Sequence, residues 1–266
     1  MKNILISIKI LVVLLLLASC SDSYLDVNED PNNPVTVSPD LILPVALNYS
    51  AIIEERDRGQ NHLGNMFMYN WSQSDGFSWY NDEFQYKVTP SFYSQIFDYT
   101  YGNVLKQYYG LETLEGAEYG NYQAIAKIMK SLHFQILVDA YGDIPYSEAL
   151  QRGSNPTPKY DDAQTVYESL MVELSNAIDL INTTSAVTGA LVPADDDGIF
   201  GGDMDMWKTF ANTIKLRMLV RQSDMSGRDG YIQAEFDKIA AEGSGFMNED
   251  VLINIGYNQT DNQQNR

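Results

Sequence analysis

The sequence predicts a mainly all-α protein with long irregular loops. Apolar residues recur at helical spacing through most of the chain, whereas a single segment near its end alternates like a strand. The clearest helix lies in the stretch Tyr122–Leu150, where apolar residues occupy much of the circumference, so we expect it to be buried among other helices. With 266 residues, 44% of them hydrophobic, the chain is long enough for a sizeable core.

The first residues have the features of a secretory leader. Lys2 and Lys9 accompany the apolar run Ile10–Ala18, which is shorter than the roughly 20 residues that a membrane-spanning helix needs. The run ends at Leu-Ala-Ser-Cys20, which resembles the bacterial lipobox, and Cys20 is the only cysteine of the chain. We therefore expect residues 1–19 to be a lipoprotein signal peptide and Cys20 to carry the acyl anchor, the alternative being an ordinary signal peptide.

The mature chain is predicted to begin with a tether. Residues 20–39 are rich in proline, asparagine and acidic side chains, a composition that spaces a domain from its anchor and does not pack. Residues 40–266 are then expected to form one helical domain. Its first helix is predicted over Asp40–Arg58 and its second over Gln60–Gln73.

A loop without helical periodicity separates these helices from the next ones. It covers residues 74–88 and contains many aromatic residues. Thr89 is expected to cap a third helix that opens with Pro90. The long central helix is predicted from about Tyr119 until Gly142 and a proline three residues later end it.

An aspartate is expected to cap each of the two long helices that follow. Asp161 or Asp162 precedes apolar positions that recur with helical spacing over Val166–Ile181. Asp203 precedes a second apolar stripe, which covers Trp207–Met218.

A last helix, about Tyr231–Glu242, is followed by a predicted strand. Val251–Tyr257 alternates between apolar residues that would face one side and residues that would face the other. A lone strand needs a partner, and no other strong strand is visible, so we expect the sequence to be truncated and the missing part to supply the pairing. An extended tail is the alternative.

Composition and motifs argue against several classes of function. The formal net charge of −19 repels phosphate backbones, which argues against nucleic-acid binding. The chain has only two histidines, of which His133 is expected to be a packed core residue, and it contains no hydrolase, Walker or dinucleotide motif. We therefore expect no enzyme and no catalytic residue. A glycan hydrolase stays open as an alternative, because acidic residues are plentiful, and so does a purely structural scaffold.

We expect no cofactor. Asp195 and Asp197 offer a weak Ca²⁺ candidate, since the run lacks the spacing of a calcium loop with its distant glutamate. A turn followed by a helix cap is the competing interpretation of this run.

The aromatic loop is the best candidate for a binding site. Sugars present flat C–H faces and peripheral hydroxyls, which match aromatic rings and Asn or Asp side chains. The expected ligand-binding residues are Trp71, Phe77, Trp79, Tyr80, Asn81 and Asp82. The competing interpretation is that these rings fill gaps in the core.

Three segments carry a family resemblance. They are Tyr141–Ala149 (YGDIPYSEA), the stretch from Tyr160 to Ile178 that begins YDDA, and Trp207–Arg217 (WKTFANTIKLR). Together with the lipobox and the Tyr24–Asp26 opening of the mature chain, they resemble the SusD/RagB family of Bacteroidetes outer-membrane lipoproteins.

This resemblance implies a helical scaffold of tetratricopeptide-like helix pairs, anchored by lipid in the outer membrane at the cell surface. It further implies that the protein captures a nutrient, usually a glycan or oligosaccharide, for a partner TonB-dependent transporter of the SusC type. A peptide-binding member of the same family is the alternative. The family is considerably longer than this chain.

Overall fold

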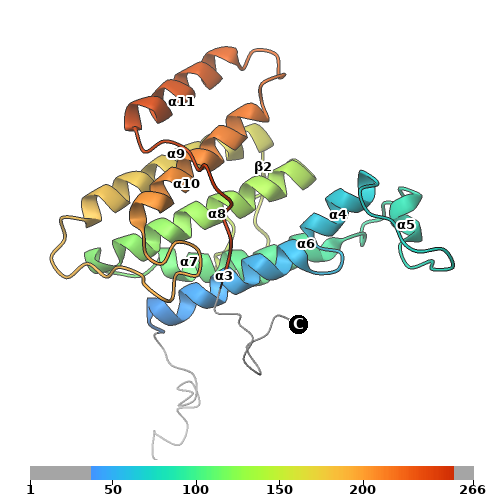
Figure 1. The fold of residues 1–266 in the computed structure, drawn as a ribbon, viewed down its shortest axis with the longest axis horizontal. Helices are drawn as coiled ribbons and strands as arrows, with labels where there is room; N and C mark the ends of the chain where they lie inside the picture. Colours follow the sequence, from blue (N-terminus) through green and yellow to red (C-terminus); the bar gives the residue numbers. More distant parts are fainter. Residues whose placement is uncertain (1–36, 255–266) are drawn as a thin grey trace, which may run out of the picture. The chain divides into compact units, whose positions relative to one another are not determined.

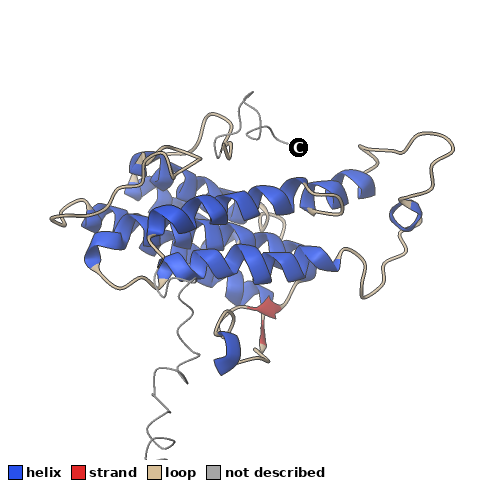
Figure 2. Cartoon of the chain, turned by 90° about the horizontal axis from the view of Figure 1, so that it is seen from below, coloured by secondary structure: helices blue, strands red, loops and turns tan. Residues whose placement is uncertain are grey.

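Helices make up most of the part of the chain that the structure describes (Figures 1 and 2). The structure, a computed structural model, describes residues 37–254, and the element labels are those of Figure 1. The helices and helical turns are α3 (Pro39–Glu55), α4 (Gln60–Phe67), α5 (Asn81–Phe84), α6 (Ser94–Tyr99), the π-helical η1 (Thr100–Leu105), α7 (Lys106–Glu112), the 3₁₀ turns η2 (Ala117–Tyr119) and η3 (Arg152–Ser154), α8 (Gly120–Tyr141), α9 (Ala163–Thr184), α10 (Met204–Val220) and α11 (Asp229–Glu242). This confirms the predicted all-α class.

The central helix α8 packs against α7, α9 and α10 (Figure 1). Its residues Ile125, Ile128 and Leu137 are completely buried, as its apolar circumference predicts. The helix ends at Gly142, whose φ of 76° lies in a region that L-residues with a side chain rarely adopt. The predicted position of this helix and its abrupt end are therefore both confirmed.

A two-stranded ladder follows α8 and was not expected from the sequence. Strand β1 (Ile144–Pro145) pairs antiparallel with β2 (Tyr160–Asp161). The carboxylate of Asp161 accepts hydrogen bonds from the backbone N–H groups of Tyr146 and Ser147 at 3.2 and 2.7 Å. The loop after α8 is thus tied to the start of α9.

The predicted caps of α9 and α10 are present. Asp162 accepts from the backbone N–H of Thr165 at 2.9 Å, which selects it over Asp161 as the cap of α9. Asp203 accepts from the backbone N–H groups of Asp205 and Met206 at the start of α10. Each aspartate pairs donors that the first turn of its helix leaves free.

Two boundaries near the aromatic loop differ from the prediction. Helix α4 ends at Phe67, six residues early, because Tyr69 adopts a left-handed φ of 56°. Helix α6 begins at Ser94, so Thr89 is not its cap: Tyr93 precedes it with a left-handed φ of 52° and the ring of Tyr93 is buried. Burial of the Tyr93 ring compensates for the unfavourable left-handed backbone that interrupts the predicted helix. The periodicity of apolar residues does not reveal this interruption.

The predicted strand Val251–Tyr257 is wrong for the residues that the structure describes. Residues 251–254 form no strand, although Val251 and Ile253 pack against the core while Leu252 is exposed. The backbone N–H of Asn254 donates to the carbonyl oxygen of Gly198 at 2.6 Å. The alternation therefore reflects an extended segment lying on the core, and residues 255–257 lie outside the described part.

Between residues 37 and 254 no helix is long and apolar enough to cross a membrane. The expected signal peptide (1–19), the lipidation site Cys20 and nearly all of the tether (20–39) lie outside the described residues, and α3 begins at the last residue of the predicted tether.

Candidate ligand-binding surface

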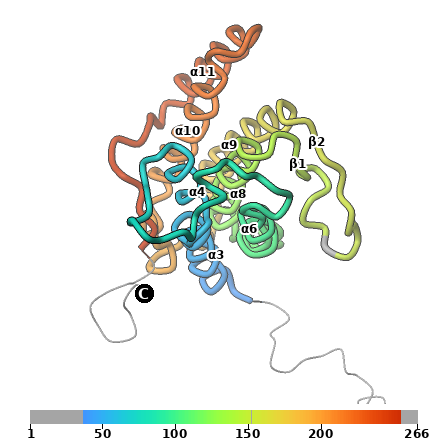
Figure 3. The backbone as a smooth tube through the Cα atoms, turned by 90° about the vertical axis from the view of Figure 1, so that its right-hand side faces the viewer, coloured from blue at the N-terminus to red at the C-terminus, as the bar shows by residue number. Residues whose placement is uncertain are grey.

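The predicted site residues lie on the segment between α4 and α6, which contains α5 (Figures 1 and 3). The rings of Trp71, Phe77 and Trp79 are exposed by 45%, 63% and 74%. These values exclude the interpretation that the three rings fill the core. Exposed clusters of large apolar side chains are unusual on a surface that nothing binds.

Trp79 combines a free ring with a fixed backbone. Its backbone N–H donates to the side-chain oxygen Oε1 of Gln73 at 3.0 Å, and its backbone carbonyl oxygen accepts from Nη2 of Arg58 at 3.2 Å. Both hydrogen bonds leave the indole uncommitted. The ring is therefore held in place at its base while its face stays open to a ligand.

Tyr80 is committed to the protein more strongly than the other predicted rings. Its hydroxyl donates to Oδ1 of Asp57 at 3.2 Å, and its ring meets His62 edge to face at 4.7 Å. The ring of Trp71 lies 5.9 Å from the same histidine. His62 is buried, so its ring contacts both Trp71 and Tyr80 from the interior of the protein.

The predicted polar partners lie in the first turn of α5. Asn81 and Asp82 are both exposed, and Oδ1 of Asp82 lies 3.6 Å from Nζ of Lys87. The next residue, Glu83, turns inward and is almost fully buried beside Nε of Arg58, at 3.4 Å. The short helix thus separates two exposed polar side chains from one buried carboxylate.

Tyr86 extends the aromatic surface and was missed by the sequence reasoning. Its ring is 52% exposed and lies 6.1 Å from the ring of Tyr69, which is 57% exposed. The hydroxyl of Tyr86 donates to the carbonyl oxygen of Phe67, and that of Tyr69 to the carbonyl oxygen of Phe84. Both tyrosines have a left-handed backbone, which no sequence pattern indicates for residues other than glycine.

Of the two Ca²⁺ candidates, Asp197 has a structural role as a hydrogen-bond acceptor. Asp197 is buried, and its carboxylate accepts four N–H groups, from Ile199, Phe200, Gly202 and the indole of Trp207. Asp195 is exposed. Within residues 37–254 no group of three or more His, Cys, Asp or Glu side chains is arranged to hold a metal ion.

Comparison with protein-family models gives a match over residues 31–265, to the family described as "Starch-binding associating with outer membrane". The comparison with curated proteins gives no match.

Solved structures match most of the described chain. A chitin-binding protein is 28% identical with a TM-score of 0.61, over 80% of this chain and 44% of its own length. A chitin-binding SusD homologue from Flavobacterium johnsoniae is 22% identical with a TM-score of 0.62, over 78% and 44%. A SusD homologue from Bacteroides vulgatus is 20% identical with a TM-score of 0.63, over 80% and 45%. The chain spans less than half the length of these structures.

Proposed function

Since the chain belongs to the SusD-like family, we propose that it is a non-catalytic, lipid-anchored protein of the outer-membrane surface that captures a glycan or oligosaccharide. It then passes the ligand to a TonB-dependent transporter of the SusC type. The observation that carries the glycan-binding part is the exposure of Trp71, Phe77 and Trp79 on one aromatic segment.

Stacking is the physical basis of this proposal. The C–H face of a sugar ring buries apolar area against an indole or phenyl ring, and its hydroxyls remain at the edge for polar partners. Asn81 and Asp82 follow directly after the rings and are exposed, so they can donate to and accept from such hydroxyls. No covalent step is involved.

Anchoring and hand-off rest on the family and on the leader. The family description associates its members with the outer membrane, and the lipobox-like sequence before Cys20 supplies an anchor at the start of the mature chain. An acyl anchor keeps the binding domain at the membrane in which the transporter lies.

The glycan-binding part is tested by a binding and turnover panel. Full-length mature protein is incubated with starch, chitin and other neutral polysaccharides, and both bound protein and new reducing ends are measured. We expect retention on at least one polysaccharide without new reducing ends. Reducing ends that follow the purified protein would identify the hydrolase instead. Failure on all polysaccharides, with peptides retained, would identify the peptide-binding alternative.

A further inference from the structure

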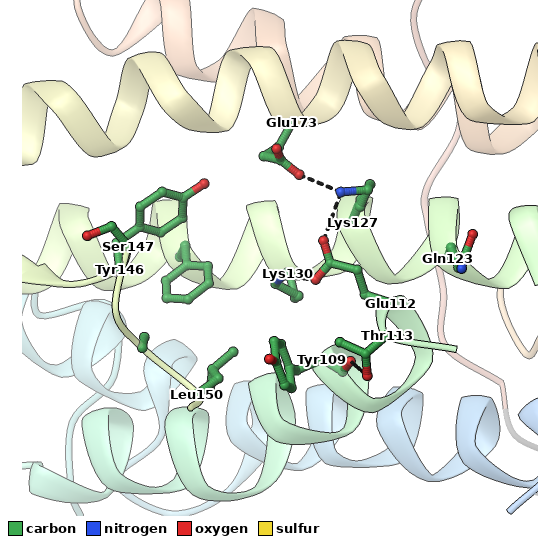
Figure 4. A pocket seen from close by; sticks show the side chains of 12 residues that line it. Tyr109, Glu112, Thr113, Gln123, Lys127, Lys130, Tyr146, Ser147, Leu150 and Glu173 are labelled. Atoms are coloured by element: carbon green, nitrogen blue, oxygen red, sulfur yellow. Dashed lines mark hydrogen bonds and ion pairs between the residues drawn. The ribbon is translucent and has the colours of Figure 1, made fainter. Parts of the chain in front are cut away.

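A second candidate site lies away from the aromatic segment, among α7, α8, α9 and the loop after β1 (Figure 4). It is a pocket of about 530 Å³, within the range of about 300–1,000 Å³ that is typical of small-molecule sites. None of its lining residues belongs to the aromatic segment.

Four charged side chains from three helices meet in this pocket. Nζ of Lys127, on α8, lies 2.8 Å from Oε1 of Glu112, on α7, and 2.8 Å from Oε2 of Glu173, on α9. Lys130 pairs with the other oxygen of Glu112. Figure 4 shows Glu173 pointing down from α9 toward Lys127. The set is balanced, with two cations and two anions.

The ion pairs favour the charged forms of Glu112 and Lys127. Burial alone raises the pKa of Glu112, but the ammonium groups of Lys130 and Lys127 outweigh it and hold this pKa below the usual value. Burial lowers the pKa of Lys127, but its hydrogen bonds to Glu112 and Glu173 outweigh that effect and raise it. A charged ligand would therefore find no unpaired counter-charge among these four side chains.

Aromatic and apolar groups form the other part of the lining. The rings of Phe134 and Tyr146 meet edge to face at 5.0 Å, and Leu150 lies beside them in the pocket wall. The ring of Tyr109 lies 5.7 Å from Nζ of Lys130, so it connects the apolar part with the charged part. A ligand that fits must have both an apolar face and polar edges.

We propose that this pocket binds a short, uncharged saccharide. A sugar hydroxyl accepts from a lysine ammonium and donates to a neighbouring carboxylate, so vicinal hydroxyls can bridge the Lys127–Glu173 pair without breaking it. The C–H face of the sugar would lie against Tyr109 or Tyr146. The hydroxyls of Thr113 and Ser147 already donate within the protein, to Tyr109 and Asp161, and keep lone pairs that can accept at the rim.

The inference is independent of the aromatic surface, since either site could bind sugar without the other. It is tested on ¹⁵N-labelled full-length mature protein by titration with neutral mono- and disaccharides, namely glucose, galactose, mannose, N-acetylglucosamine, maltose and cellobiose. We expect at least one sugar to shift the backbone amides of residues 109–113 and 146–150.

Two pocket variants and one control separate this site from the aromatic surface. Tyr109→Ala and Glu173→Gln should each weaken the sugar affinity, obtained from the shifts of the pocket amides, at least tenfold. Because Glu173→Gln preserves the shape of the side chain, it still tests the pocket if Tyr109→Ala folds poorly. Trp79→Ala should leave the pocket response unchanged. The inference is overturned if no sugar shifts these amides, if only Trp79→Ala abolishes the shifts, or if glycine or phenylalanine at equal concentration shifts them and the sugars do not.

Discussion

The Nε2 atom of His133 lies 2.8 Å from the Oγ atom of Ser50, and this contact joins α8 to α3 inside the core. The hydroxyl of Ser50 also donates to the carbonyl oxygen of Ala46 and lies 2.8 Å from the hydroxyl of Tyr108. The imidazole of His133 thus belongs to a buried polar cluster with Ser50 and Tyr108. The Nδ1 atom is buried without a partner among the described residues, which confirms the predicted core histidine.

This arrangement predicts a loss of stability on mild acidification. Burial lowers the pKa of His133 to about 4, from 6.5. As the pH falls from about 6.5 to about 4, His133 is therefore protonated in the unfolded chain but stays neutral in the folded chain. The stability is fully present above pH 6.5, and about 3 kcal/mol of it is lost across this window.

Urea unfolding of the wild type and of His133→Gln, at several pH values between 7 and 4, checks this prediction. The variant lacks the imidazole of His133 and keeps that of His62, so the free energy of unfolding should depend less steeply on pH than in the wild type. Carboxylates titrate in both proteins and cancel in the comparison. Equal slopes would contradict the assignment to His133.

Asp197 is predicted to be a structural residue of the loop before α10. Asp197→Ala leaves three backbone N–H groups and the Nε1–H of the fully buried Trp207 without their acceptor. A buried donor without a partner costs about 1–3 kcal/mol, so the free energy of unfolding should fall by roughly 3 kcal/mol or more. The matched control Asp195→Ala, at an exposed position, should stay within about 0.5 kcal/mol.

The same pair of variants tests the Ca²⁺ candidate. Because the carboxylate of Asp197 is already occupied by N–H donors, we expect millimolar Ca²⁺ to leave the thermal midpoint of the wild type unchanged. A rise in the midpoint that disappears in Asp195→Ala would show that the loop binds the ion.

Cys20 is predicted to carry the membrane anchor. In cells, Cys20→Ala should remove the acylation site, so the protein should accumulate unprocessed or leave the outer-membrane fraction. Fractionation followed by detection of metabolically incorporated fatty acid measures both effects. A variant that still partitions with outer membranes and carries fatty acid would disprove anchoring through this residue.

Association with a transporter is the prediction that depends most on the family. Affinity purification of the tagged lipoprotein from outer membranes, solubilised in mild detergent, should recover a large TonB-dependent barrel. The protein with Cys20→Ala serves as the control for membrane proximity. Recovery of the lipoprotein alone under these conditions would count against the hand-off.

Sequence patterns predicted the long helices well because their signals are local. In α9 and α10 the apolar stripe and an aspartate cap coincide, and both are visible in the chain. The short strands β1 and β2 were not predictable, since two residues are too few for a pattern and their pairing joins residues 15 and 17 positions apart. The left-handed backbones of Tyr69 and Tyr93 were missed for a related reason, because they go with tertiary contacts and not with a local preference: the ring of Tyr93 is buried, and the hydroxyl of Tyr69 donates to the carbonyl oxygen of Phe84.

The candidate site was predicted in part. The absence of helical periodicity indicated correctly that Trp79 is not a core residue, and its exposure follows from that. The role of Arg58 and Gln73 in holding its backbone depends on contacts across 21 and 6 residues, which no motif encodes. The pocket around Lys127 was missed for the same reason, since its charged groups come from three different helices.

The central claim, glycan capture by the aromatic segment, is tested most directly by comparing Trp79→Ala with Tyr160→Ala. Both rings are highly exposed, by 74% and 64%, but Tyr160 lies on β2, outside the segment. Affinity for the polysaccharide retained in the panel should fall roughly ten- to a hundredfold in Trp79→Ala, as the loss of about 1–3 kcal/mol of ring burial implies. The thermal midpoint of Trp79→Ala should stay near the wild-type value, and Tyr160→Ala should bind normally. Unchanged affinity in Trp79→Ala, or a collapse of its thermal midpoint, would contradict the account.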